Sequence, residues 1–218
     1  MRIKLFTLIF VSLITLSANK VLAQKDYTIK YELKSDSDLS AMMMDGATLT
    51  LMFKDDKAKV DVDMSMMKTV VVAHDKAQKG LMLMSIDMMG MRIAVPIPKE
   101  DYNKMQEETK TPEVRFTNET KDILGYKCKQ AFVQNEGAEV EIWYTPKIIP
   151  ANTNTQYTYA AIKGMPLEIH TREDGVTMTF TATSVSDKKI NESEFSLDIP
   201  DGYEEMTMEE LEQMGGGN

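Results

Sequence analysis

The stretch Val176-Thr177-Met178-Thr179-Phe180-Thr181-Ala182-Thr183 alternates apolar and polar side chains without interruption. Successive side chains of a β-strand point to opposite faces, so this pattern predicts a strand with one face on a core and the other in water. Asp174-Gly175 directly precedes it and separates it from a second run, Leu167–Arg172. An Asp-Gly pair between two such runs is typical of a hairpin turn. The segment therefore predicts an antiparallel hairpin.

The same period of two recurs along the chain, for example in residues 27–33, 60–66 and 138–144, with short turn signals between the runs. About ten or eleven strand candidates follow one another in one meandering order. Helical signals are few: a polar segment at 98–108, and Thr207-Met208-Glu209-Glu210, a capping box that opens a short helix ending at Gly215. We therefore predict a mainly β fold, a large curved antiparallel sheet or open half-barrel with a few short helices.

The first 23 residues have the features of a secretory signal peptide. Arg2 and Lys4 precede an apolar run from Leu5 to Leu16, and Val21-Leu22-Ala23 predicts cleavage before Gln24. The run is short for a membrane span, which argues against the alternative of an uncleaved anchor helix. We expect an exported protein, in the periplasm or outside the cell, that is soluble and has no transmembrane segment after cleavage. Residues 24–214 are predicted to form one β-rich domain, followed by a disordered tail at 215–218.

Charge limits the possible partners. Removing Arg2, Lys4 and Lys20 with the signal peptide lowers Lys+Arg from 25 to 22 against 34 acidic residues, a net charge of −12. Such an acidic chain repels nucleic acid and anionic lipid head groups. We therefore expect no nucleic-acid binding and no stable electrostatic docking on an anionic membrane.

Methionine is unusually frequent and unevenly placed. The chain has 19, of which twelve lie between residues 42 and 91. The stretch Leu81-Met82-Leu83-Met84 is apolar at every position. A strand that is apolar on both faces must be covered twice, by the core on one side and by another part of the protein on the other.

Three interpretations of these methionines are open. They are core filler, since Met adapts to irregular gaps, or part of them lines a cavity for a flexible apolar ligand such as a lipid or acyl chain. The candidates for such a cavity are Met52, Val62, Met64, Met66, Met82, Met84, Met88, Met91, Arg92 and Ile93. In the third interpretation the thioethers bind Cu(I) or Ag(I). The candidate metal ligands are then Met64, Met66, Met82 and Met84.

No pattern in the chain predicts an enzyme or a bound cofactor. Its two histidines, His74 and His170, have no obvious nucleophile or metal partner in the sequence, and no nucleotide-binding, metalloprotease or nucleophile-elbow motif is present. The lone Cys128 lies in an alternating segment, which favours a small apolar side chain facing the core. We therefore expect a non-catalytic binding protein without a cofactor, or a structural module of the bacterial envelope with methionines as plain core.

Four motifs occur in order along the chain: Ile-Leu-Gly-Tyr-Lys-Cys-Lys at 123–129, Glu-Ile-Trp-Tyr-Thr-Pro at 141–146, Gly-Met-Pro-Leu at 164–167, and Phe-Ser-Leu-Asp-Ile-Pro-Asp-Gly-Tyr at 195–203. In these motifs the chain resembles the exported bacterial proteins grouped as domain of unknown function 4412. That family is similar in architecture to the lipoprotein carrier LolA, which implies an open half-barrel with helices over a concave apolar face. The resemblance assigns no catalytic residues. A carrier of this kind is expected to place an Arg in its cavity, and Arg92 is the candidate near the Met-rich strands.

Overall fold

The computed structural model describes residues 25–38, 45–108, 113–135, 138–149, 162, 164–173 and 175–215. The predicted signal peptide and the final residues 216–218 lie outside them. The strands are β1 (Tyr27–Ser35), β2 (Thr48–Lys54), β3 (Lys57–Met64), β4 (Met67–His74), β5 (Lys79–Ile86), β6 (Met91–Ile97), β7 (Val114–Ile123), β8 (Tyr126–Asn135), β9 (Ala138–Thr145), β10 (Met165–Glu173), β11 (Val176–Ser186) and β12 (Glu204–Glu205). The helices are η1 (Asp87–Met89), α2 (Lys99–Glu108), η2 (Glu192–Phe195) and α3 (Met208–Gly215).

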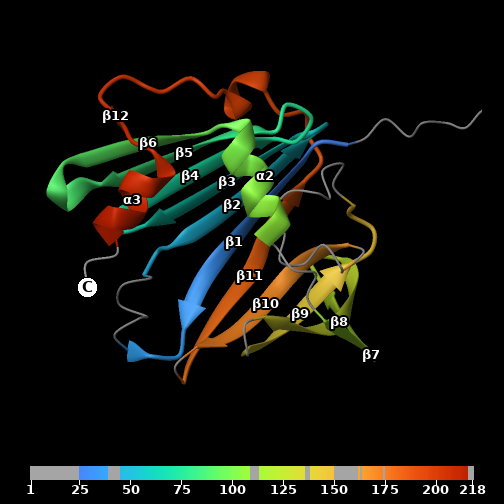
Figure 1. The fold of residues 1–218 in the computed structure, drawn as a ribbon. Coiled ribbons are helices and arrows are strands. Elements are labelled where there is room, and N and C mark those ends of the chain that lie inside the picture. Colours follow the sequence, from blue (N-terminus) through green and yellow to red (C-terminus); the bar gives the residue numbers. More distant parts are fainter. Residues whose placement is uncertain are drawn as a thin grey trace, which may run out of the picture.

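All twelve strands form one sheet in the order β12-β6-β5-β4-β3-β2-β1-β11-β10-β9-β8-β7 (Figure 1). The prediction of a mainly β protein with one large curved antiparallel sheet and few helices is confirmed. The order differs from a single meander, because β7 lies at one edge, β6 lies beside β12 at the other edge, and β1 pairs with both β2 and β11. Pairing of β1 with β11 joins two meanders, β1–β6 and β7–β11, and only the short β12 runs parallel to its neighbour.

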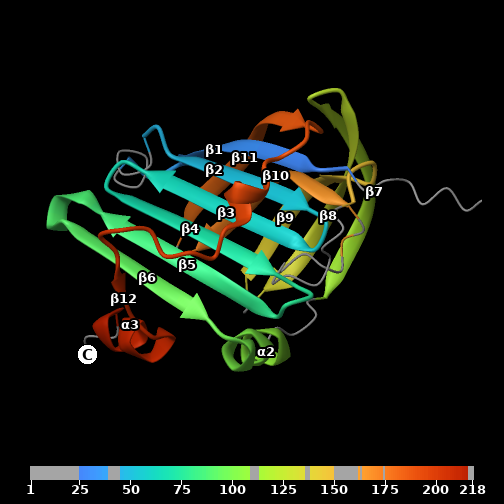
Figure 2. The same ribbon diagram turned by 90° about the horizontal axis from the view of Figure 1, so that it is seen from above.

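The sheet bends so that β8 and β9 lie on the opposite side of β3–β5 from the segment that follows β11 (Figures 1 and 2). We call the face inside this bend the inward face. Cross-strand register places one row of inward side chains across the middle of the sheet, because each pair on neighbouring strands lies on the same face. This row runs through Ile93, Met84, Thr69, Val62, Leu49 and Tyr31.

The main core lies on the inward face around β1. Ile29, Tyr31 and Leu33 are buried there with Leu51 and Phe53 of β2. The Tyr31 hydroxyl donates to the carbonyl of Pro166 at 2.6 Å, which satisfies a polar group inside the core. These alternating apolar residues place one face of β1 and of β2 on the core.

The outward face of β2–β5 is covered by residues 188–203, which run from β11 to β12 and which we call the C-terminal strap (Figure 2). Ile190, Phe195 and Leu197 of the strap form one apolar cluster with Val70 and Val72 of β4 and with Met52 of β2. Phe195 is only 1% exposed. The strap thus covers the outward face at β2 and β4, beside the buried Leu81, which pairs with Val72.

Both helices lie near the β6 edge of the sheet (Figure 2). In α2, the Tyr102 hydroxyl donates to Asp75, and Gln78 donates to Asn103 at 2.9 Å, so this helix is fixed to the β4–β5 turn. At α3 the predicted capping box is present. The Thr207 hydroxyl accepts from the Glu210 amide at 3.2 Å, and the Glu210 carboxylate accepts from the Thr207 amide at 2.8 Å. None of the helices among the described residues has the length and apolar character that crossing a bilayer needs.

Candidate functional site

The inward face of β3–β6 is a regular apolar surface of sixteen positions, four on each strand, which we call the inward array. Register arranges it in four cross-strand rows: Ala58, Ala73, Gly80 and Ile97; Val60, Val71, Met82 and Val95; Val62, Thr69, Met84 and Ile93; and Met64, Met67, Ile86 and Met91. Thr69 is the only member with a polar side chain, and none is charged. Side chains increase in size from the first row to the last, where methionine dominates.

Most of the inward array is only half-buried. Five members are buried, namely Ala58, Gly80, Ile93, Val95 and Ile97, and the other eleven keep part of their surface exposed. Core positions of a packed sheet are normally covered. A contiguous, incompletely covered apolar surface of this kind is typical of sites that bind ligands or other proteins.

The structure brings together six of the ten residues that the sequence proposed for an apolar cavity. Val62, Met64, Met82, Met84, Met91 and Ile93 all belong to the inward array. The other four lie elsewhere. Met52 is on the outward face, in the cluster beneath the strap, and Met66 and Met88 lie at hairpin ends with exposed fractions of 42% and 79%.

Arg92 also lies outside the inward array. It is next to Ile93 on β6, and successive strand residues point to opposite faces, so Arg92 is on the outward face and exposed to solvent. Sequence reasoning had selected it only because it is close in the chain to the Met-rich strands. The arginine expected inside a carrier cavity is therefore not supplied by this residue.

The methionines proposed as soft-metal ligands are divided between two places. Met64, Met82 and Met84 are on the inward face, whereas Met66 is in the β3–β4 turn. Strands β3 and β5 are two positions apart in the sheet, a separation of about 10 Å. Among the described residues, no group of three or more His, Cys, Asp or Glu side chains could hold a metal ion either. Metal binding through methionine stays a prediction.

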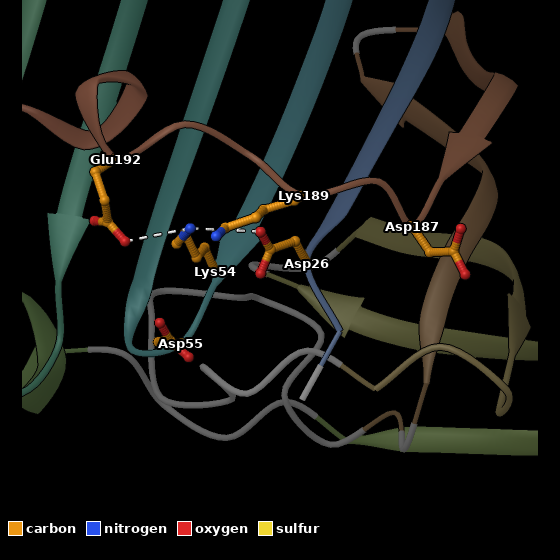
Figure 3. A pocket seen from close by; sticks show the side chains of 6 residues that line it. All are labelled: Asp26, Lys54, Asp55, Asp187, Lys189 and Glu192. Carbon is orange, nitrogen blue, oxygen red and sulfur yellow. Dashed lines mark ion pairs between the residues drawn. The ribbon is translucent and has the colours of Figure 1, made fainter. Parts of the chain in front are cut away.

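A polar pocket of about 440 Å³ lies where the strap leaves β11 (Figure 3). Its central residue is Lys54, only 7% exposed, which donates to the carbonyl of Ile190 at 2.8 Å. The Lys54 ammonium also lies 3.2 Å from Glu192 and 3.6 Å from Asp26. Burial by itself would lower the pKa of Lys54, but these two carboxylates raise it. The polar groups at the centre of this pocket are thus engaged in holding the strap on the sheet.

A second polar network, which the sequence did not predict, lies on the outward face of β7–β11. Glu168 accepts from Lys121 at 2.6 Å and from His170 at 2.5 Å. Burial would raise the pKa of Glu168, but the hydrogen bonds from Lys121 and His170 lower it. Lys121 also lies over the Trp143 ring at 4.2 Å. In the sequence, only the alternation of Glu168 with His170 indicated that these two side chains lie on one face. The hydrogen bond from Lys121 of β7 could not be predicted, because it depends on how the strands are placed in the sheet.

This second network has the character of a structural cross-strand system. A carboxylate with a lowered pKa is a poor general acid, because it is already ionised at neutral pH. Glu141 accepts from both Gln130 and Trp143, at 2.7 and 2.9 Å. The acceptors here are satisfied by neighbouring strands, as expected of groups that stabilise a sheet.

Cys128 is buried. Its exposed fraction is 0%, and burial raises the pKa of its thiol to about 11. A thiol of this kind is protonated at neutral pH and lacks the lowered pKa of a nucleophilic cysteine. The residue is a small core side chain, as its alternating segment predicted.

The family described as "N-glycanase peptide, N-terminal domain" matches residues 91–202, from β6 to the end of the strap. Two solved crystal forms of PNGF-II are similar, each with 16% sequence identity and a TM-score of 0.53; they cover 87% and 88% of this chain but 33% and 32% of theirs. The chain thus spans about a third of the length of PNGF-II. At this identity the likeness concerns the fold alone.

Two further solved structures resemble the chain more weakly. A β-barrel-like protein of domain of unknown function 1849 from Brucella abortus has 7% identity and a TM-score of 0.37, with 76% of this chain and 99% of that chain covered. A LolA superfamily protein from Nitrosomonas europaea has 7% identity and a TM-score of 0.32, covering 79% and 90%. These scores are too low to carry an argument about function. Comparison with curated proteins gives no match. Membership of domain of unknown function 4412 stays a prediction.

Proposed function

The chain belongs to the family described as "N-glycanase peptide, N-terminal domain", and we propose that it is a non-catalytic binding module whose inward array holds an apolar ligand such as a lipid or acyl chain. The observation that carries this proposal is the combination of composition and exposure in the inward array. Its sixteen positions contain no charge, and eleven of them are only half-buried. A plain core face would be covered more completely.

The kind of side chain supports a ligand without a fixed shape. Five methionines lie in the inward array, at least one on each of its four strands and three of them in its last row: Met64, Met67, Met82, Met84 and Met91. Unbranched thioether side chains adapt to different shapes at little cost, which suits a flexible alkyl chain. Covering the exposed part of one such side chain is worth at most about 1 kcal/mol. Several of them together give a useful affinity.

The absence of catalysis is part of the proposal. In the described part of the chain, the best-connected carboxylates, Glu168 and Glu192, are both paired with lysines that hold strands or the strap in place. The family is named for N-glycanase activity. We assign this activity to the regions of longer proteins, such as PNGF-II, that this chain does not cover. The chain would then act beside such an enzyme or on its own as a binder.

We also propose that the protein is exported, to the periplasm or beyond the cell. The basic start, the apolar run and Val21-Leu22-Ala23 support cleavage before Gln24. Edman or mass-spectrometric sequencing of the protein from a secreting host should find Gln24 as the first residue. A retained Met1 would contradict export by this route.

Ligand binding can be tested with a fluorescent fatty acid on the full mature protein. We expect saturable uptake that is lost in Met84→Asp, which places a carboxylate in the middle of the inward array. Ser85→Asp is the matched control, since it changes the next residue of β5 on the opposite face. Met84→Ser, a milder change, should weaken uptake without affecting the circular dichroism spectrum.

Three results would contradict the proposal. These are the absence of uptake by the wild type together with no amphiphile in native mass spectra, equal uptake by Met84→Asp and wild type, and equal loss in Met84→Asp and Ser85→Asp.

A further inference from the structure

Three methionines lie exposed at neighbouring hairpin ends, and we call them the Met rim. Met66 is in the β3–β4 turn, and Met88 and Met89 are in η1 between β5 and β6. Their exposed fractions are 42%, 79% and 68%. Both hairpins end on the same side of the sheet (Figure 2), and their centres are two strand spacings apart, about 10 Å.

Folding does not explain apolar side chains at these positions. A side chain that is 79% exposed buries little surface, so a polar residue would serve the turn equally well. Hairpin ends normally carry Gly, Asn, Asp or Ser. Among the described residues, the Met rim supplies three of the seven large apolar side chains that are exposed.

The Met rim is continuous with the inward array. Its neighbours along the strands are Met64, Met67, Ile86 and Met91, which form the last row of the array. The apolar surface therefore extends from the hairpin ends to the middle of the inward face. The rows of the inward array carry no charged side chain, and the exposed Asp87 of η1 lies beside the Met rim.

The charge of the protein determines whether the Met rim can bind an anionic or an uncharged lipid surface. Without the predicted signal peptide the chain has 22 basic against 34 acidic residues, a net charge of −12, and at this end Lys68 is already paired with Asp61 at 3.3 Å and Asp63 at 3.4 Å. No excess of positive charge is left for anionic head groups, which an acidic protein repels. A lipid surface without net charge removes this penalty and still accepts apolar side chains at its interface.

We propose that the Met rim docks on a zwitterionic lipid surface, from which an alkyl chain passes to the inward array. The docking step stands on the exposed methionines, and the passage of the chain rests on the proposed function. Through the Met rim the protein thus binds lipid surfaces reversibly.

Flotation of the mature protein with phosphatidylcholine vesicles tests the docking step. We expect the wild type to float with the vesicles and the Met66→Ser, Met88→Ser, Met89→Ser triple variant to lose binding on the order of 100-fold, because three apolar side chains no longer enter the interface. The control is Leu124→Ser with Ile149→Ser, which removes exposed apolar residues outside β3–β6 and should float as the wild type does. Adding phosphatidylglycerol to the vesicles should weaken binding.

A wild type that stays in solution, a triple variant that floats unchanged, or stronger binding to the anionic vesicles would each overturn the docking proposal. Fatty-acid uptake without vesicles separates the two proposals. The triple variant should retain uptake, and Met84→Asp should lose uptake but keep flotation. Loss of uptake by the triple variant would contradict a distinct docking role for the Met rim.

Discussion

Strands β3–β6 carry apolar residues on both faces, but the rest of the molecule covers the two faces to different extents. The outward face has charged residues on all four strands and an apolar centre that the C-terminal strap covers. The inward face has no charge and is only partly covered. The comparison teaches that apolar composition alone does not separate core from binding surface. Whether an apolar face is core or binding surface depends on the segment that covers it.

Two kinds of contact hold the strap on the outward face. Phe195 fills the apolar centre of the outward face, and the His74 imidazole donates to the Phe195 carbonyl at 2.7 Å. Around this centre, Lys54 and Lys59 pair with Glu192 and Glu194. A segment held by both apolar and ionic contacts behaves as part of the fold.

The largest expected effect is the removal of the strap anchor. Phe195→Ala should lower the free energy of unfolding by about 3–5 kcal/mol, because the ring is buried and its removal leaves a cavity above Val72. Urea denaturation followed by circular dichroism measures this. A loss below about 1 kcal/mol would show that the strap is not an integral cover.

The two faces can be compared directly at neighbouring residues of β5. Leu81 on the outward face is 2% exposed, whereas Met82 on the inward face is half-buried. We expect Leu81→Ala to cost about 2–5 kcal/mol and Met82→Ala about 1 kcal/mol, in the same urea assay. Equal costs would mean that the inward array is packed as tightly as the outward face, which would remove the support for a ligand site.

A smaller effect should depend on pH. Hydrogen bonds from Lys57 and Lys54 lower the pKa of Glu192, so its contribution to stability is complete above its unfolded value, about 4.3, and is lost as pH falls through the lower folded value. Glu192→Gln should therefore be less stable than the wild type at pH 7, and the difference should shrink below about pH 4. Asp87→Asn, at an exposed hairpin end, is the control. A difference that does not change with pH would contradict an ionic anchor.

The smallest effect on stability should come from oxidation. Under dilute peroxide, peptide mapping should find Met66, Met88 and Met89 oxidised first, Met82 and Met84 later, and the buried Met165 last. A bound fatty acid should protect Met82 and Met84 and leave Met88 unprotected. If the fatty acid protects none of them, it does not bind on the inward array.

Much of the fold followed from local patterns. Alternation identified β1, β3, β9 and β11, and the Thr207–Glu210 capping box identified the start of α3. The pairing of β1 with β11 could not be predicted, because it joins residues such as Tyr31 and Ala182 that are far apart in the chain. For the site, parity placed Met82 and Met84 on one face. Parity also separates Arg92 from Ile93, and Arg92 was a candidate only because it is close in the chain to the Met-rich strands. The outward position of Met52 could not be predicted, because parity does not tell which face of each strand turns inward.

The sequence by itself determined that this protein is a sheet of half-buried strands and that the strand around Leu81–Met84 has apolar residues on both faces. These conclusions depend only on the two-residue period of a strand and on the cost of leaving apolar surface in water. Only the tertiary structure decided that the strap covers Val72 and its neighbours while the Met-rich face stays half open. That choice depends on contacts between β4 and a segment more than a hundred residues later, which no local pattern encodes.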